Sequence, residues 1–93
     1  MPDRDAYFAI PARYPELRGK VALVTGSTQD IGKGIAERLT REGMKVVINS
    51  RTPEAVEETT EELRGYGADV LPIVADVSED EGIARLIDGV MEQ

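Results

Sequence analysis

The most constraining feature of the sequence is a turn at residues 25–36, which joins a short apolar segment to an amphipathic one. It reads Thr-Gly-Ser-Thr-Gln-Asp-Ile-Gly-Lys-Gly-Ile-Ala, so glycine and small polar residues dominate it. The first backbone amides of a helix have no partner inside the helix, and they point at any anion that approaches. A strand, a small turn and a helix in this order therefore predict a phosphate-binding site.

Composition and length limit the other possibilities. The chain has 93 residues, of which 41% are hydrophobic, which fits one small globular domain. No run approaches the roughly 20 apolar residues of a membrane helix, and residues 1–20 lack the apolar stretch of a signal peptide. We therefore expect a cytoplasmic protein without a membrane partner. With neither cysteine nor histidine, we expect no disulfide, no thiolate nucleophile and no metal site.

The charge is unevenly distributed along the chain. The net charge is −7, yet residues 1–51 contain nine basic and six acidic residues, whereas residues 52–93 contain two and twelve. Nucleic acids and anionic membranes bind basic surfaces, so an acidic chain argues against both as the main partner. The predicted phosphate turn nevertheless lies in the basic half.

The hydrophobic pattern predicts alternating strands and helices. The short apolar runs at 21–24 and 46–48 are typical of strands buried on both faces of a parallel sheet. Between them, Ile31, Ile35 and Leu39 form the apolar stripe of a helix that Gly43 ends.

The second half of the chain continues this alternation. Thr52 and Pro53 are expected as the N-cap and first residue of a helix with Val56, Thr60 and Leu63 inside. Residues 70–74 read as a third strand, and the proline at position 72 requires an edge position.

The last predicted element is a helix that starts at a capping box. Ser78 and Glu81 form the box, and an apolar stripe follows at residues 83, 86, 87, 90 and 91. The sequence thus predicts an α/β fold, the N-terminal βαβαβα half of a Rossmann-like doubly wound parallel sheet over residues 20–93. In the strand order 3-2-1-4-5-6 the third strand lies at an edge, which suits its proline.

Residues 1–19 are predicted to form an N-terminal arm without regular structure. They contain three prolines and three of the four aromatic residues, Tyr7, Phe8 and Tyr14. We favour an arm whose aromatic side chains pack on the domain or on a neighbouring subunit over a flap that covers a ligand.

Four separated motifs follow one another at the ends of predicted strands, and together they resemble the start of a short-chain dehydrogenase/reductase over residues 17–93. The resemblance implies an NAD(P)(H)-dependent oxidoreductase of which this chain is the cofactor-binding portion. The motifs are Gly-Lys-Val-Ala-Leu-Val-Thr-Gly at 19–26, Ile31-Gly32, Asn-Ser-Arg at 49–51 and Ala-Asp-Val at 75–77.

The resemblance also implies roles for individual residues. Gly26 and Gly32 match two glycines of the family's Thr-Gly-x-x-x-Gly-x-Gly turn, which lets the backbone approach the cofactor's pyrophosphate. Asp76 and Val77 match the pair beside the adenine, where the carboxylate accepts a hydrogen bond from the adenine amino group. The alternative is that Asp76 bonds only to nearby backbone. The expected cofactor-binding residues are Gly26, Ser27, Thr28, Asp30, Ile31, Gly32, Ser50, Arg51, Asp76 and Val77.

The end of the second strand bears on the choice of cofactor. An acidic residue there pairs with the ribose hydroxyls of NAD, whereas a cation accommodates the additional phosphate of NADP. Here the strand ends with Ser50 and Arg51, and Lys33 is a possible second cation. We therefore expect NADP(H) rather than NAD(H), with a solvated Arg51 without a ligand role as the alternative.

Asp30 departs from the family pattern, because it stands where the turn has its middle glycine. Asp tolerates unusual backbone angles, so the turn can still form, but its charge opposes a pyrophosphate. We consider two alternatives: Asp30 caps the helix in the empty site and swings out when cofactor binds, or it lowers cofactor affinity outright.

No catalytic residue is expected within these 93 residues. The family's catalytic serine and Tyr-x-x-x-Lys pair would follow the third helix, and no tyrosine here has a lysine four positions later. The spacing argues against a P-loop, because five residues separate Gly26 from Gly32 and a glycine follows Lys33. Two other readings stay open: a non-catalytic module that binds a dinucleotide weakly or acts in assembly, and a different doubly wound domain, such as a methyltransferase-like or sugar-nucleotide-modifying one.

The first strand would have a bare edge if no fourth strand covers it. We therefore expect self-association or pairing with a C-terminal part of the fold.

Overall fold

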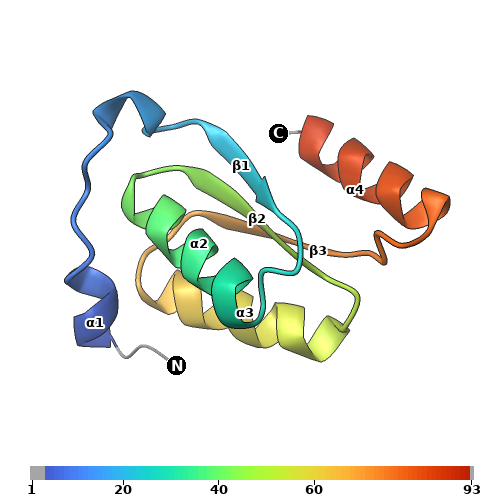
Figure 1. Ribbon diagram of the computed structural model, residues 1–93, viewed down its shortest axis with the longest axis horizontal. Helices are drawn as coiled ribbons and strands as arrows, with labels where there is room; N and C mark the ends of the chain where they lie inside the picture. Colours follow the sequence, from blue (N-terminus) through green and yellow to red (C-terminus); the bar gives the residue numbers. More distant parts are fainter. Residues whose placement is uncertain (1–3, 93) are drawn as a thin grey trace.

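The computed structural model describes residues 4–92 as one parallel three-stranded sheet with helices on both faces (Figure 1). The strands are β1 (Val21–Val24), β2 (Lys45–Ser50) and β3 (Val70–Val74), in the spatial order β1-β2-β3. The helices are α1 (Arg4–Phe8), α2 (Asp30–Arg41), α3 (Pro53–Gly65) and α4 (Asp80–Met91), with a short 3-10 helix η1 (Pro15–Leu17). None of the described helices is long and apolar enough to span a membrane. The Rossmann-like βαβαβα prediction is confirmed.

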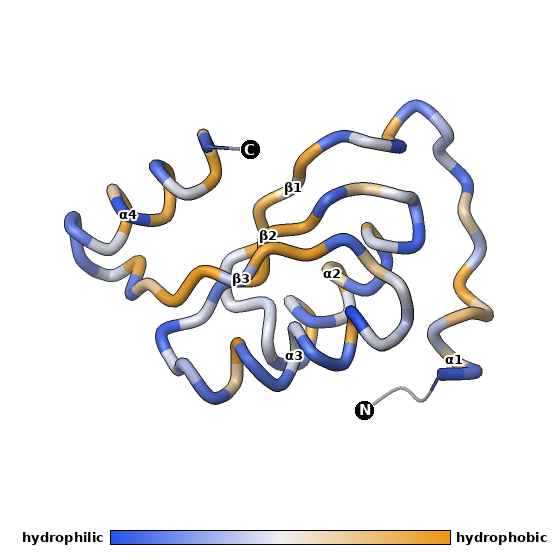
Figure 2. Tube along the Cα trace, turned by 180° about the vertical axis from the view of Figure 1, so that it is seen from behind, coloured by the Kyte–Doolittle hydropathy of each residue, from blue (hydrophilic) through white to orange (hydrophobic). Residues whose placement is uncertain are grey.

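The sheet has β2 at its centre. Val46 lies opposite Ala22 of β1 and Val70 of β3, and the side chains of residues 46–48 have no exposed surface. Burial on both faces was predicted for β2 and is confirmed, and the hydrophobic strands form the middle of the molecule in Figure 2.

The two faces of the sheet carry separate hydrophobic clusters. On one face, side chains of β1 and β2 meet α2 and α3 through Ala36, Val56 and Leu63. On the other, Leu86 of α4 packs with Val47 and Ala75, and no β1 residue of the described chain belongs to this cluster. Helices α2 and α3 thus cover one face and α4 part of the other (Figure 1).

Strand β1 is therefore open on the α4 side. Val21 is 44% exposed and Leu23 is 40% exposed. The prediction that β1 is buried on both faces is wrong, because among residues 4–92 the hydrophobic cluster beneath α4 is built from β2 and the β3 side of the sheet.

The opposite edge of the sheet, along β3, is partly occupied. The Ala75 amide donates to the Ser50 carbonyl, so Ala75 directs its backbone groups toward β2. Successive residues of a strand alternate in direction, so Val70, Pro72 and Val74 direct their N–H and C=O groups to the free edge. Pro72 has no N–H group to offer, as expected for an edge strand. The carbonyls of Val70 and Val74 accept hydrogen bonds from Arg64 and Arg85 at 3.2 and 3.4 Å.

The helix faces agree with the sequence pattern only in part. Val56, Thr60 and Leu63 of α3 are buried as predicted, and Gly43 ends α2 with a φ of 84°.

The predicted stripe of α2 is right for Leu39, which packs against the core, and wrong for Ile31 and Ile35. Ile31 is 80% exposed and Ile35 is 47% exposed, whereas Ala36, Glu37 and Thr40 are buried. The small Ala36 lets α2 approach the sheet closely, and the polar Thr40 is buried because Tyr7 supplies a hydrogen-bond partner.

The predicted capping box of α4 is also wrong. Glu79 is the N-cap residue and makes no side-chain capping bond, and Ser78 lies before the helix with its amide and hydroxyl bonded to Asp76. Of the predicted stripe only Leu86 is fully buried, and Ile87 is 51% exposed.

Part of the N-terminal arm is helical, so the prediction of no regular structure is wrong for Arg4–Phe8. The helix forms around Tyr7, which is 2% exposed and stacks on Tyr66 with ring centroids 4.5 Å apart. The Tyr7 hydroxyl lies 2.8 Å from the Thr40 hydroxyl. Packing on the domain, the favoured interpretation, agrees with these contacts.

Glu42 at the end of α2 holds the second half of the arm. Its carboxylate accepts hydrogen bonds from the backbone amides of Arg13 and Tyr14 at 2.9–3.0 Å and pairs with Arg38 at 2.7 Å. Burial alone would raise the pKa of Glu42, but these two amides and the guanidinium together lower it. The Arg38 and Arg41 side chains also donate to the carbonyls of Pro11 and Phe8, so several contacts attach the arm to the second half of α2.

Candidate functional site

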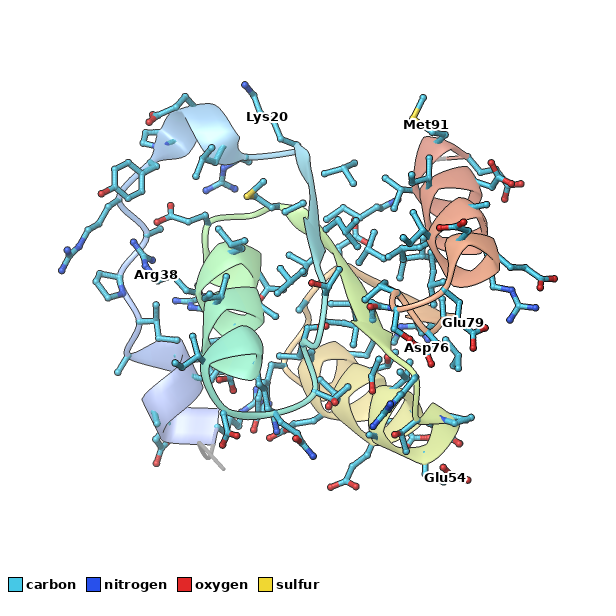
Figure 3. The ribbon with its side chains drawn as sticks, turned by 45° about the vertical axis from the view of Figure 1, so that its right-hand side comes forward. Lys20, Arg38, Glu54, Asp76, Glu79 and Met91 are labelled. Carbon is cyan, nitrogen blue, oxygen red and sulfur yellow. The ribbon has the colours of Figure 1, made fainter. Side chains whose placement is uncertain are left out.

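The carboxyl ends of the three strands surround a pocket of about 300 Å³. Each strand contributes the residues that follow it or end it, as expected for a parallel sheet. Figure 3 shows Asp76 at this end, between the start of α3 and the first turn of α4. The lining residues are Gly26, Asn49, Ser50, Arg51, Ala75, Asp76, Val77 and Ser78. Five of these, Gly26, Ser50, Arg51, Asp76 and Val77, are predicted cofactor-binding residues.

The glycine turn after β1 brings the start of α2 against the end of β1. Gly26 has a φ of 62°, a left-handed conformation that glycine adopts without a steric penalty. A Cβ atom at Gly32 would collide with the Gly26 carbonyl oxygen. Gly32 thus permits the close approach of α2 to the turn.

Asp30 occupies the position of the family's middle glycine in a left-handed conformation. Its φ is 49°, and it is the one non-glycine residue with a positive φ among residues 4–92. The turn therefore forms with aspartate, as expected from the tolerance of this residue for such angles.

Asp30 does not cap the helix. The N-cap of α2 is Gln29 without a side-chain capping bond, and Asp30 is the exposed first helical residue. The alternative in which Asp30 caps α2 in the empty site is therefore wrong for this structure. Within residues 4–92 the N-cap side chain does not bond to the first amides of α2, so these amides can meet an anion.

The other predicted turn residues lie in different environments. Ser27 is fully buried, and its hydroxyl accepts a hydrogen bond from the Asn49 amide at 2.8 Å. Its side chain thus connects the turn to β2. Thr28 is half-buried, and Ile31 is exposed at the start of α2.

Asp76 is held by the residue two positions later. Its Oδ1 accepts hydrogen bonds from the Ser78 hydroxyl at 2.6 Å and from the Ser78 amide at 2.9 Å. These bonds, chiefly the one from the hydroxyl, lower the pKa of Asp76, and the charge of Arg51 lowers it further. The carboxyl group is therefore an anion at neutral pH and an acceptor for a ligand N–H group.

The two predicted cations differ in position. Arg51 is exposed and lines the pocket. The hydroxyl of the neighbouring Ser50 accepts a hydrogen bond from the Thr52 amide at 3.2 Å. Lys33 instead forms an ion pair of 2.6 Å with Glu62 of α3. Lys33 does not line this pocket, and its role as a possible second cation stays a prediction.

Sequence reasoning missed three lining residues, Asn49, Ala75 and Ser78. Asn49 is a buried amide at the end of an apolar strand, and a polar residue in that place is a signal for a structural or ligand role. Ser78 was assigned to a helix cap. Among residues 4–92, no group of three acidic side chains is placed to bind a metal ion.

Comparison with known proteins identifies the family. A family model described as short chain dehydrogenase matches residues 20–93. The chain belongs to the short-chain dehydrogenase family. Its fold and pocket agree with this, because uncapped amides, a closely approaching glycine turn and an anionic acceptor suit a dinucleotide.

Curated relatives are similar over most of this chain. Glucose 1-dehydrogenase 2 of Bacillus subtilis (strain 168) is 45% identical over 80 residues, which make up 85% of this chain and 31% of the relative. Tropinone reductase-like 3 of Erythroxylum coca is 47% identical over 75 residues, 81% of this chain and 29% of the relative. The chain thus spans about 30% of the length of these relatives.

Solved structures of the family superpose on the same region. L-Sorbose reductase from Gluconobacter frateurii, in complex with NADPH and L-sorbose, has a TM-score of 0.77 and 32% identity over 83% of this chain and 30% of that chain. A short-chain dehydrogenase/reductase from Burkholderia phymatum, in complex with NAD, has a TM-score of 0.79 and 35% identity over 83% of this chain and 27% of that one. Related folds thus bind either nicotinamide dinucleotide.

Proposed function

We propose that this chain is the N-terminal cofactor-binding portion of an oxidoreductase that transfers hydride between NADP(H) and a carbonyl or alcohol substrate. The observation that carries the choice of NADP(H) is the end of β2. Ser50 and Arg51 line the pocket there, at the position where an NAD-binding site has an acidic residue. The planar guanidinium group can donate two parallel hydrogen bonds to two oxygens of a phosphate, whereas a carboxylate would repel the phosphate charge.

The geometry supports one placement of the cofactor. The open amides at the start of α2 receive the pyrophosphate, Asp76 accepts from the adenine amino group, and Arg51 binds the 2′-phosphate of the ribose. When bound, the nicotinamide supplies the hydride chemistry. The described residues supply binding and orientation.

A titration tests this proposal. NADPH and NADH are added separately while nicotinamide fluorescence is followed, with wild type, Arg51→Ala and the control Arg13→Ala. The Arg13 side chain is exposed and lies outside the pocket, so the control makes the same charge change.

We expect Arg51→Ala to lower the affinity for NADPH by about tenfold, which is the range for loss of a hydrogen bond to a charged group. The affinity for NADH should change little. Arg13→Ala should leave both affinities near wild type. An unchanged preference in Arg51→Ala would refute the assignment of Arg51 to the 2′-phosphate.

The second candidate is a non-catalytic module that binds a dinucleotide weakly or acts in assembly, and Asp30 at the phosphate turn favours it. A Tyr-x-x-x-Lys sequence downstream of residue 93 in the gene would favour the enzyme. For both candidates we propose a cytoplasmic location and a partner strand at the free edge of β1, from a second copy or from a C-terminal part of the fold.

A further inference from the structure

Asn49 joins the ends of all three strands. Its side chain is 1% exposed, and its backbone amide donates to the Ser27 hydroxyl at 2.8 Å. Its carbonyl accepts from the Ser27 amide at 2.9 Å. Its side-chain amide donates to the carbonyls of Ile73 and Ala75 at 3.1 and 3.3 Å. One residue of β2 therefore connects the phosphate turn after β1 to the end of β3.

The bonds to β3 act where the strand pairing stops. The last ladder bond between β2 and β3 runs from the Ala75 amide to the Ser50 carbonyl at 3.1 Å, and Asp76 follows directly. The Asn49 side chain fixes the Ala75 carbonyl, whose peptide group also contains the Asp76 nitrogen. Asp76 thus begins from a fixed backbone position.

Asp76 is fixed on its other side by Ser78, which engages Oδ1 through two hydrogen bonds. Within residues 4–92 these bonds leave Oδ2 as the oxygen with open acceptor positions. The carboxylate is thereby oriented by one contact before it in the chain and one after it.

We propose that Asn49 is a positioning residue for purine recognition. It holds Asp76 where the Asp76 carboxylate accepts a hydrogen bond from the exocyclic amino group of adenine. The inference rests on the proposed dinucleotide function and extends it to a residue that contacts no reacting atom. It assigns the selectivity for an amino-bearing purine to the pair Asn49 and Asp76 acting together.

The test compares NADPH with the reduced form of nicotinamide hypoxanthine dinucleotide phosphate, in which an oxo group replaces the adenine amino group. Wild type should prefer NADPH by about tenfold, as expected for one hydrogen bond to a charged acceptor. Asn49→Ala removes the contact with β3, and Asn49→Asp places an oxygen against two carbonyl oxygens. Both should reduce the preference to less than about twofold.

A control separates positioning from stability. Val70→Ala weakens the core at the opposite end of β3, where Val70 is 5% exposed, and should lower the melting temperature without changing the purine preference. A double-mutant cycle of Asn49→Ala with Asp76→Asn should show that the second substitution adds no further loss of preference.

The outcomes are distinct. If wild type binds neither dinucleotide, the proposed function fails; if it prefers adenine and folded Asn49 variants keep that preference, only the positioning role is refuted. If both variants fail to fold, hydrogen exchange of the Asn49 side-chain amide is followed in wild type by NMR. NADPH should protect these protons more than the hypoxanthine analogue does, and equal protection would refute the inference.

Discussion

Removal of the Asp30 charge should strengthen cofactor binding at the phosphate turn. Asp30 is the exposed first residue of α2, and its carboxylate makes no capping bond. Two unit charges about 4 Å apart repel by about 1 kcal/mol in water and about 4 kcal/mol at an effective dielectric of 20. Because Asp30 is exposed, the lower figure applies, and it corresponds to an approximately fivefold change in affinity.

The assay is a fluorescence titration with NADPH at low salt. Asp30→Asn keeps a residue that tolerates a φ of 49°, so it removes the charge while preserving the turn. We expect about fivefold tighter binding for Asp30→Asn, and at least as much for Asp30→Gly. The gain should shrink as ionic strength rises, because salt screens exposed charges.

Asp69→Asn is the matched control, since Asp69 is exposed at the opposite end of the sheet and precedes β3. It should leave the affinity unchanged. If Asp30→Asn and Asp30→Gly bind NADPH no more tightly than wild type at low salt, the pyrophosphate does not lie at this turn and the reasoning is refuted.

Two further predictions concern stability. Gly32→Ala should lower the free energy of unfolding by about 1–3 kcal/mol in denaturant melts, because its Cβ meets the Gly26 carbonyl; Gly34→Ala, with open space around it, is the control, and equal losses would contradict the close-approach role. Burial raises the pKa of Glu37 above its ordinary 4.5, because the folded state favours the neutral carboxyl group. The contribution of Glu37 to the free energy of unfolding is therefore present at low pH and is lost as pH rises through the raised pKa. Glu37→Gln should therefore gain melting temperature relative to wild type between pH 4 and pH 7, and a constant difference across this range would contradict the assignment.

The strands could be predicted because each is a short apolar run with a clear boundary. Residues 70–74 match the predicted third strand at both ends, and Pro72 correctly indicated an edge. The pocket residues at the strand ends followed from the same logic, since parallel strands bring their carboxyl ends together.

The remaining features depend on contacts between elements that are distant in sequence. Lys33 has the right position for a phosphate cation, but Glu62 lies 29 residues later and pairs with it. Ser78 matches a capping pattern, yet its hydroxyl and amide both donate to Asp76 and the N-cap is Glu79. Helical periodicity shows which residues share a stripe, and it does not show whether another element covers them, as the exposed Ile31 and Ile35 illustrate.

The two edge strands of the sheet differ in how readily they can pair with an additional strand. Along β3, Pro72 offers no donor, and two arginines already occupy the outward carbonyls. Along β1, the backbone is open beside two exposed apolar side chains. We therefore propose that an added strand pairs at β1, and two copies of this chain that met there, β1 to β1, would cover both of their open β1 edges.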